Sequence, residues 1–453
     1  MPRTRLAFAL LALAAPIAAA AQAPAPPKLP AKLSLEDALA IFRAHGLDLM
    51  IAEAAVESAE GDARIARQVY NPNVAYSFSH IFNYDPNQTC PVDPATGLGG
   101  PGTCSPNVHS LSLGDNAAIE DVLSGKRGLR IAVTQAALRA ARMGRIDAQR
   151  NLEFQVKQAY IQAVQARDNL DFALEVQKAY GQTYQLTQLR YDKGAISEAD
   201  AAKVETAKLE ADQALTAAEQ ALQAAKVSLA FLLGVREALP PFEVDQDLPK
   251  FVVPTPLATA TPDSLLVEAY ETRPDLKAQK AQEERATAAV RQALRARFPD
   301  LNLELGFTYA ATGGGPFSSN TVPPTLIVGV SGNVPLFYQQ QGEIRKAEAD
   351  LRTQFAQYAK IRAQVLSDLN TALANFRASR ELVERMESRL LDRARKARDL
   401  IFIQYQKGAA SLLEYLDAQR TYVAATVEYL QDLTNYWTAV FQLEQAVGTD
   451  LRK

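Results

Sequence analysis

The chain is poor in the residues that enzymes and metal sites most often use. Among its 453 residues are two cysteines and three histidines, and His45, His80 and His109 lack the spacing of a metal site. The glycine-rich segment at residues 97–102 lacks the Lys-Ser or Lys-Thr pair of a phosphate-binding loop, and no nucleophile is paired with a base. A formal net charge of −3 gives no basic footprint for nucleic acid. We therefore expect no enzymatic activity, no metal and no cofactor.

Long apolar runs are missing beyond the first 21 residues. This leader has Arg3 and Arg5 at its start, an apolar run at residues 6–17 and small residues before Gln22, as in a secretory signal peptide. Its apolar run is shorter than the ~20 residues that a spanning helix needs. No later run is long enough either, so any membrane span must be made of strands. We predict that residues 1–21 are a signal peptide and that the mature chain is exported.

Proline and glycine are absent from two long parts of the chain. No proline occurs between Pro106 and Pro240 or after Pro335, and Gly408 is the one glycine between residues 343 and 447. Such stretches can hold very long helices. Apolar residues at steps of three and four predict one helix over residues 344–401, about 85 Å long. The pattern resumes after Gly408, which predicts an antiparallel return helix.

The two halves of the chain repeat this plan. Helices are predicted at about residues 128–189 and 198–233, and they are joined at a Tyr-Asp-Lys-Gly break that begins at Tyr191. The later break, which begins at Tyr405, reads Tyr-Gln-Lys-Gly, so tyrosine and glycine recur in the same register. Pro72 and Pro299 also match, but at a slightly longer interval, which places a short insertion in the first half between Pro72 and Tyr191. We infer an internal duplication.

Each half also contains two predicted strands before its long helix. After Pro72 and Pro299, apolar and polar residues alternate, and weaker candidates follow at residues 108–113 and 325–334. Ser34 opens a capping box, and Thr261 with Pro262 opens a helix in the second half. We divide the chain into a signal peptide (1–21), an extended segment (22–33), a first repeat (34–233), a linker or equatorial region (234–261), a second repeat (262–448) and a tail (449–453).

Four strands per chain cannot form a membrane barrel alone. Open sheet edges are not tolerated in hydrocarbon, and the smallest barrels have about eight strands with filled interiors. Three copies would supply 12 strands around a lumen, and the helices, far too long for the bilayer, would project as a tube on one side. The predicted fold class is mainly α, with long antiparallel coiled-coil hairpins and four strands that contribute to an oligomeric membrane β-barrel.

The duplication, the signal peptide, the paired breaks and the segment at residues 405–420 resemble the TolC family of outer-membrane efflux proteins. The resemblance implies a homotrimer in the cell outer membrane, with a 12-stranded barrel and a periplasmic helical tunnel. It also implies docking to a periplasmic adaptor (a membrane fusion protein) and an inner-membrane pump of the RND or ABC type. The alternative is a periplasmic adaptor or another secreted coiled-coil protein. An adaptor would carry one hairpin, so two hairpins and two strand pairs favour the channel.

The resemblance also suggests a gate. Glu414 and Asp417 lie three residues apart on one helix face and match positions that ring the family's periplasmic aperture with carboxylates. Tyr405 and Asp200 match positions that bond across neighbouring hairpins and hold the tunnel closed. The family's arginine in this network falls at Ala410, which cannot donate a hydrogen bond. Ordinary roles remain open: a solvated acidic pair, a tyrosine packed at a hairpin and an aspartate in a first helical turn.

Small residues mark the tips of both hairpins, and two cysteines mark a loop. Glycine at Gly194 and Gly408 suits a turn that needs a positive φ. With their neighbours they could also leave a groove for an adaptor tip; the tip residues are Gly194, Ala195, Ile196, Gly408, Ala409 and Ala410. Cys90 and Cys104 lie near each other in sequence within one exported loop, where a disulfide is expected, though two free thiols are the alternative.

Overall fold

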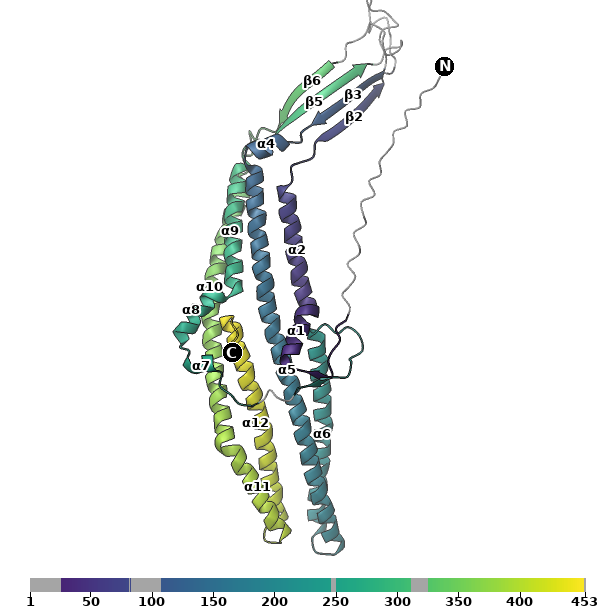
Figure 1. The fold of residues 1–453 in the computed structure, drawn as a ribbon, viewed down its shortest axis with the longest axis vertical. Helices are drawn as coiled ribbons and strands as arrows, with labels where there is room; N and C mark the ends of the chain where they lie inside the picture. The colour runs from purple at the N-terminus through teal and green to yellow at the C-terminus, as the bar shows by residue number, and fades with distance from the viewer. Residues whose placement is uncertain (1–25, 81, 83–106, 246–249, 311–324, 452–453) are drawn as a thin grey trace, which may run out of the picture.

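The chain folds into an elongated molecule with a small sheet at one end and two helical tips at the other (Figure 1). The computed structural model describes residues 26–80, 82, 107–245, 250–310 and 325–451. The predicted signal peptide, Cys90 and Cys104 lie outside the described residues. Among the helices described, none is long and apolar enough to cross a membrane.

The first half runs from one helix pair through two strands to a long helical hairpin. Its elements are β1 (Lys32–Leu33), α1 (Leu35–His45), α2 (Leu47–Arg67), β2 (Asn73–His80), β3 (Asn107–Gly114), α4 (Ala118–Leu123), α5 (Lys126–Asp192) and α6 (Glu198–Leu232). The predicted capping box is confirmed, because the Asp37 amide donates to Ser34 Oγ at 3.1 Å and the Ser34 amide donates back to the Asp37 carboxylate at 3.4 Å.

The second half repeats this order. Its elements are β4 (Glu243–Val244), α7 (Thr255–Thr259), α8 (Pro262–Thr272), α9 (Pro274–Arg295), β5 (Leu301–Ala310), β6 (Thr325–Gly332), α10 (Gln341–Arg385), a π-helical turn η1 (Met386–Leu390), α11 (Leu391–Gln406) and α12 (Leu412–Val447). Thr261 caps α8 with a proline at the start of the helix, as predicted.

The structure differs from the prediction in three places. The helix expected over residues 344–401 is interrupted by η1, and α4 was not predicted. The segment expected to be a linker instead contributes α7 and β4, and β4 pairs in parallel with β1. Phe242, Val244 and Leu257 of this segment are buried in the main core. Apolar side chains therefore anchor this segment, although its prolines and lack of periodicity had given no sign of regular elements in it.

The four longer strands form one antiparallel sheet in the order β2-β3-β5-β6 (Figure 1). Its register gathers most of the large apolar side chains on one face; they are Val74, Tyr76, Phe78, Leu111, Leu113, Leu301, Leu303, Leu305, Phe307, Tyr309, Leu326, Val328 and Val330. All of these are substantially exposed in the single chain. The opposite face is mainly polar: it carries Ser77, Ser110, Ser112, Asn302, Glu304 and Thr308, together with the apolar Val108 and Ile327. This confirms the predicted alternation of an apolar and a polar face.

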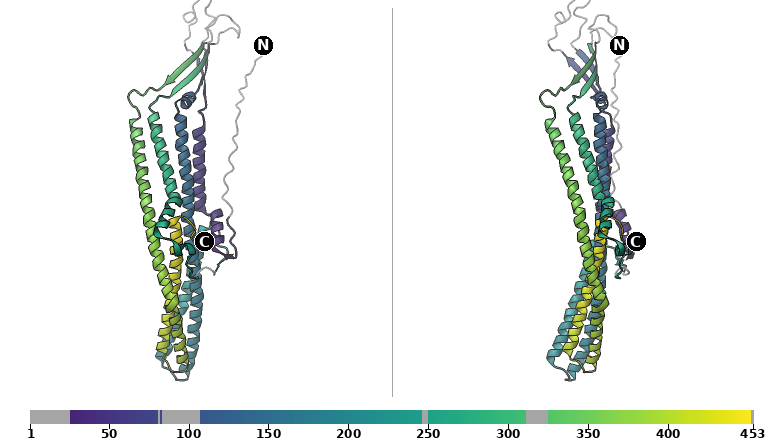
Figure 2. Two further views of the ribbon diagram at one scale, coloured as in Figure 1. Left: turned by 60° about the vertical axis from the view of Figure 1, so that its left-hand side comes forward. Right: turned by 90° about the vertical axis from the view of Figure 1, so that its left-hand side faces the viewer.

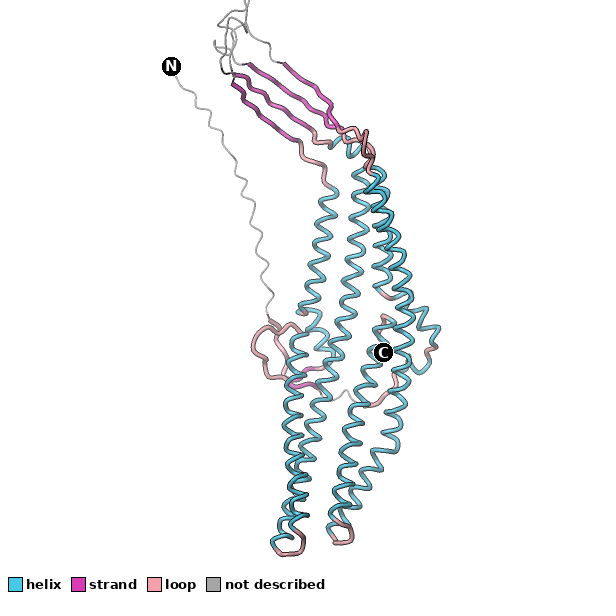
Figure 3. The backbone as a smooth tube through the Cα atoms, turned by 180° about the vertical axis from the view of Figure 1, so that it is seen from behind, coloured by secondary structure: helices cyan, strands magenta, loops and turns pink. Residues whose placement is uncertain are grey.

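Below the sheet the helices form a curved single layer (Figure 2). Near the sheet the order is α2, α5, α9, α10, and near the tips α6 packs on α5, α5 on α12, and α12 on α10 and α11. Figure 3 shows the same layer from behind, with the strands continuing the helices at one end. The two free edges of the layer are therefore α2 and α6 on one side and α10 and α11 on the other.

The main core lies midway along the layer, where the two halves meet. Tyr160 and Tyr436 are fully buried there, and their hydroxyls donate to the carbonyls of Leu33 and Val252 at 3.0 and 2.9 Å. Burial raises the pKa of both phenols to about 12, so they remain hydrogen-bond donors at neutral pH. The two tyrosines thereby fasten the N-terminal segment and the connecting segment to the helical layer.

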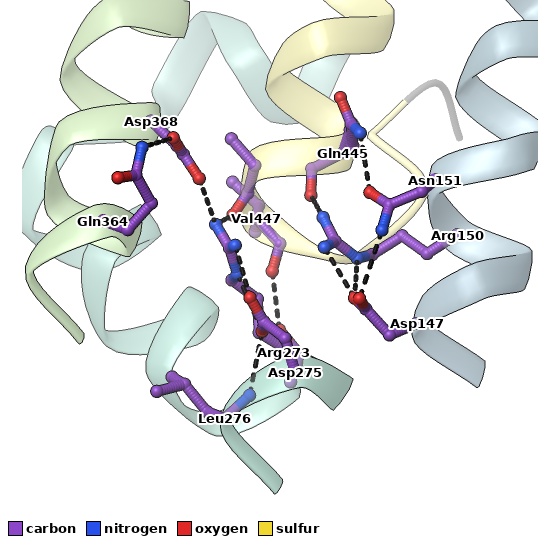
Figure 4. A network of polar contacts seen from close by, with 12 residues as sticks. Asp147, Arg150, Asn151, Arg273, Asp275, Leu276, Gln364, Asp368, Gln445 and Val447 are labelled. Carbon is purple, nitrogen blue, oxygen red and sulfur yellow. Dashed lines mark hydrogen bonds and ion pairs between the residues drawn. The ribbon is translucent and has the colours of Figure 1, made fainter. Parts of the chain in front are cut away.

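A buried arginine joins three helices beside this core (Figure 4). The Arg273 side chain is 4% exposed and pairs with Asp275 at 2.6 Å and with Asp368 of α10 at 3.1 Å. It also donates to the Ala446 carbonyl near the end of α12 at 3.3 Å. Burial raises the pKa of Asp275, but the hydrogen bonds and charge of Arg273 outweigh burial and leave that pKa below its usual value.

Candidate functional site: the tips of the two hairpins

The two hairpin tips have the same backbone geometry. Gly194 and Gly408 have φ values of +70° and +77°, in the left-handed region that favours glycine. The amides of Ala195 and Ala409 donate back to the Arg190 and Gln404 carbonyls, each at 2.8 Å, and so close the preceding helices. The predicted role of both glycines in a turn is confirmed.

The tips leave open space around these turns. Apart from each glycine and its two chain neighbours, no atom lies within 4 Å of where a Cβ would stand at Gly194 or Gly408. Ala195 and Ala409 are exposed, and Ile196 and Ala410 are partly buried. The six residues expected at a docking tip thus gather at one end of the molecule, in two small clusters with one on each hairpin (Figure 1).

A serine caps the helix that leaves each tip. The Asp200 amide donates to Ser197 Oγ at 3.2 Å, and the Glu414 amide donates to Ser411 Oγ at 3.2 Å. The Glu414 carboxylate also accepts from the Ser411 amide at 2.7 Å and completes a capping box. These hydrogen bonds from the Ser411 backbone and side chain lower the pKa of Glu414, which therefore carries its charge well below neutral pH.

The two tips differ in charge. Lys203 Nζ lies 3.3 Å from the Asp200 carboxylate, and the hydroxyl of Ser197 and this ammonium lower the pKa of Asp200. At the equivalent position the second hairpin has Asp417 in place of a lysine. Glu414 and Asp417 are both exposed. The second tip thus presents two carboxylates where the first has an ion pair.

Tyr405 lies at the contact between the two hairpins. It is 4% exposed and stacks on Tyr415, with ring centroids 5.6 Å apart and an interplanar angle of 4°. Its hydroxyl lies 3.5 Å from Thr187 Oγ1 of α5, and the Arg190 guanidinium lies 4.9 Å from its ring centroid. Within one chain the bonds of Asp200 are made with Ser197 and Lys203. Tyr405 and Asp200 thus have separate hydrogen-bond partners here, and their predicted bond stays a prediction.

Sequence reasoning missed the α5 side of this contact. Thr183 and Thr187 are buried, and Arg190 lies one turn further along the same helix. Their spacing of four and three residues was a usable signal, because it places all three on one helix face. Which helix that face meets could be learned only from the packing of the two hairpins.

No group of three or more His, Cys, Asp or Glu side chains in the described part of the chain could hold a metal ion. The charged residues at the tips are arranged instead for capping and for contact between helices. Such an arrangement can close or line an opening, because carboxylates around a narrow passage attract cations and repel one another.

Comparison with known proteins agrees with this geometry. Residues 40–235 and 265–449 match the family model described as outer membrane efflux protein. The cobalt-zinc-cadmium resistance protein CzcC of Cupriavidus metallidurans is 24% identical over 92% of this chain and 90% of its own length. The outer membrane protein TolC of Vibrio cholerae is 24% identical over 66% of this chain and 68% of its own length.

Solved structures agree in fold. The outer-membrane channel OprN superimposes with a TM-score of 0.73 at 20% sequence identity, covering 92% of this chain and 91% of its own. The family match spans both repeats and most of the chain, and it confirms the predicted family, outer-membrane location and channel role. The chain therefore belongs to the outer membrane efflux protein family.

Proposed function

We propose that three copies of this chain form a passive conduit from the periplasm to the exterior, opened when a periplasmic adaptor and an inner-membrane pump dock. The observation that carries this proposal is that both the sheet and the helical layer have free edges. The sheet is open at β2 and β6, and the helical layer is open at α2 and α6 on one side and at α10 and α11 on the other. A neighbouring copy would continue both the sheet and the layer.

The free edges carry the side chains that such a contact requires. Ile51 and Ile65 of α2 are 68% and 70% exposed, and Phe355 of α10 and Leu400 of α11 are 50% and 61% exposed. Large apolar side chains on both edges favour association, since burying them removes apolar area from water. In the sheet, β6 of one copy would run antiparallel to β2 of the next, because the strands already alternate in direction.

In this assembly the tips surround the periplasmic opening. Three copies of Glu414 and Asp417 would place six carboxylates there, which favours cations and strains the closed state by mutual repulsion. The small residues at both tips would receive the adaptor. Cargo selection belongs to the pump in this scheme, whether it is of the RND or the ABC type, because the carboxylates distinguish charge sign and not chemical identity.

Two measurements test the proposal. Purified material should run as a Sarkosyl-insoluble, heat-modifiable trimer, and it should form cation-selective channels in planar bilayers. A water-soluble, lipid-free monomer would refute it and would revive a periplasmic coiled-coil partner as the function. The family match already argues against that second interpretation, and so do the two hairpins and the four-stranded sheet in one chain.

A further inference from the structure

The four-stranded sheet has a single charged side chain apart from its histidines. Lysine, arginine and aspartate are absent from β2, β3, β5 and β6 as the structure bounds them, and Glu304 of β5 is the one glutamate in these strands. In a membrane barrel the strands alternate between a lipid face and a lumen face, and a charge on the lipid face destabilises the barrel. Glu304 lies on the polar face of the sheet, which faces water in the assembly proposed above.

Small residues surround Glu304 on this face. Its cross-strand neighbours are Gly114 on β3 and Gly329 on β6, and the adjoining rows hold mainly serine, threonine, glycine and alanine. Glycine has no side chain that could cover the carboxylate, and Glu304 is exposed in the single chain. Glu304 therefore has the longest side chain on the polar face of the described strands, and its charge stays in contact with water.

The charge of Glu304 is not balanced by its described neighbours. In the part of the chain that the structure describes, no hydrogen bond or ion pair involves its side chain. The acids just below the sheet differ in this respect, because Asp300 lies 2.6 Å from Lys126 Nζ and Asp121 lies 2.9 Å from Arg130 Nη2. A carboxylate that neither pairs with a cation nor caps a helix adds little to stability. Its effect is instead on the ions around it.

Three copies of the chain would place three Glu304 side chains at one level of the barrel. Twelve strands about 4.8 Å apart and tilted by about 40° form a ring about 24 Å across. Across so wide a ring the three carboxylates are too far apart to hold one ion between them. They act through their electric field, which concentrates cations and excludes anions within about one Debye length.

This field is separate from the field of the hairpin tips. α5 spans 67 residues between the base of the sheet and the first tip, which is about 100 Å at about 1.5 Å per residue. The Debye length is about 8 Å at physiological ionic strength and about 30 Å in 0.01 M salt. Glu304 and the tip carboxylates Glu414 and Asp417 therefore act on a permeating ion at two places, and neither alters the field at the other.

We propose that Glu304 is a specificity-determining residue of the channel and forms a second charge filter, inside the barrel, that favours cationic solutes. The inference rests on the proposed function and adds to it the charge class of solute that the barrel favours. A cationic solute is attracted at both ends of the conduit, whereas an anionic solute crosses the barrel against the field of three carboxylates.

The filter is tested by the cation-to-anion permeability ratio of the trimer in planar bilayers. The background is Glu414→Gln with Asp417→Asn, so that the tip carboxylates no longer contribute to the ratio. In 0.01 M KCl we expect Glu304→Gln to lower the ratio about three-fold, because three charges then no longer act on the ion through ~10 Å of water. Glu304→Lys should reverse the preference. In 1 M KCl, where the Debye length is about 3 Å, both variants should match the background. An unchanged ratio in dilute salt would overturn the filter.

A relocated carboxylate separates the effect of the field from any effect on the fold. Thr308 lies on the same face of β5, opposite Ser110 and Thr325. Thr308→Glu combined with Glu304→Gln should restore the cation preference, because it keeps a ring of charge and moves it along the lumen. Thr308→Gln combined with Glu304→Gln adds the same bulk without the charge and should not restore it. All variants are compared as heat-modifiable trimers, and restoration by both combinations or by neither would contradict the filter.

The proposed function and the filter fail on different results. A parent chain that forms no channel would refute the proposed function. A parent channel whose permeability ratio in dilute salt is indifferent to Glu304 would refute the filter alone.

Discussion

Asp200 and Glu414 occupy the same position in the two halves of the chain, each three residues after the serine that caps the helix leaving a hairpin tip. Three residues further on, the first hairpin has Lys203 and the second has Asp417. The same helix cap is therefore followed by a cation in the first hairpin and by a carboxylate in the second. The first tip is internally paired, and the second carries the carboxylates that we assign to the aperture.

Neutralising the carboxylates of the second tip should raise the single-channel conductance and weaken the cation selectivity. Glu414→Gln combined with Asp417→Asn removes the charges, and glutamine keeps the capping box intact. We expect higher single-channel conductance and a lower cation-to-anion permeability ratio, because repulsion and the attraction for cations are both lost. Glu198→Gln, at the other tip, is the control for loss of one exposed charge. Unchanged conductance and selectivity would remove the gate assignment and leave the fold standing.

The selectivity should also depend on pH in a defined direction. The folded pKa of Glu414 is below its unfolded value, so the stability from this cap is present above the unfolded pKa and is lost as pH falls through the folded pKa. The pH at which cation selectivity is half lost should be lower with the Ser411 hydrogen bonds than without them, measured from neutral pH down to about pH 3. Ser411→Ala removes the hydroxyl and should move the midpoint to higher pH. The same midpoint in both proteins would contradict this assignment.

Breaking the buried network at Arg273 should destabilise the assembly. Arg273→Met leaves the half-buried carboxylates of Asp275 and Asp368 without their cation, at a cost of about 3 kcal/mol. The midpoint of thermal unfolding should fall. Arg139→Met is the matched control, since Arg139 pairs with Glu284 at an exposed site where such a pair contributes about 1 kcal/mol or less. A similar loss in both variants would mean that the buried network has no special role.

Crowding the tips should impair docking and leave the trimer intact. Ala195→Trp and Ala409→Trp add bulk at exposed positions and avoid the strain that a side chain would suffer at the positive φ of Gly194 or Gly408. We expect loss of cross-linking to a co-expressed periplasmic adaptor while the heat-modifiable trimer persists. Undiminished cross-linking would leave the two tips with a structural role alone.

Much of this fold could be predicted because its signals are local. Three features that depend only on neighbours in sequence illustrate this. They are the φ required at Gly408, the cap at Ser34, and the alternation of Leu301, Leu303 and Leu305 with polar residues. The matching breaks that begin at Tyr191 and Tyr405 revealed the duplication without any structural information. The short helix α4 was not predicted, because so short a segment carries too little periodicity to be distinguished from a turn.

The candidate site was predictable on one side of each contact. Tyr405 stood out in sequence, but its partners Arg190 and Thr187 come from a helix in the other half of the chain. The amino-acid sequence by itself determined the long helices, the strand faces and the duplicated tips, because periodicity and turn chemistry act over a few residues. Only the tertiary structure decided which tyrosine is buried, where the helix bends at Met386–Leu390 and how the two hairpins touch, because those outcomes depend on packing between segments that the sequence holds far apart.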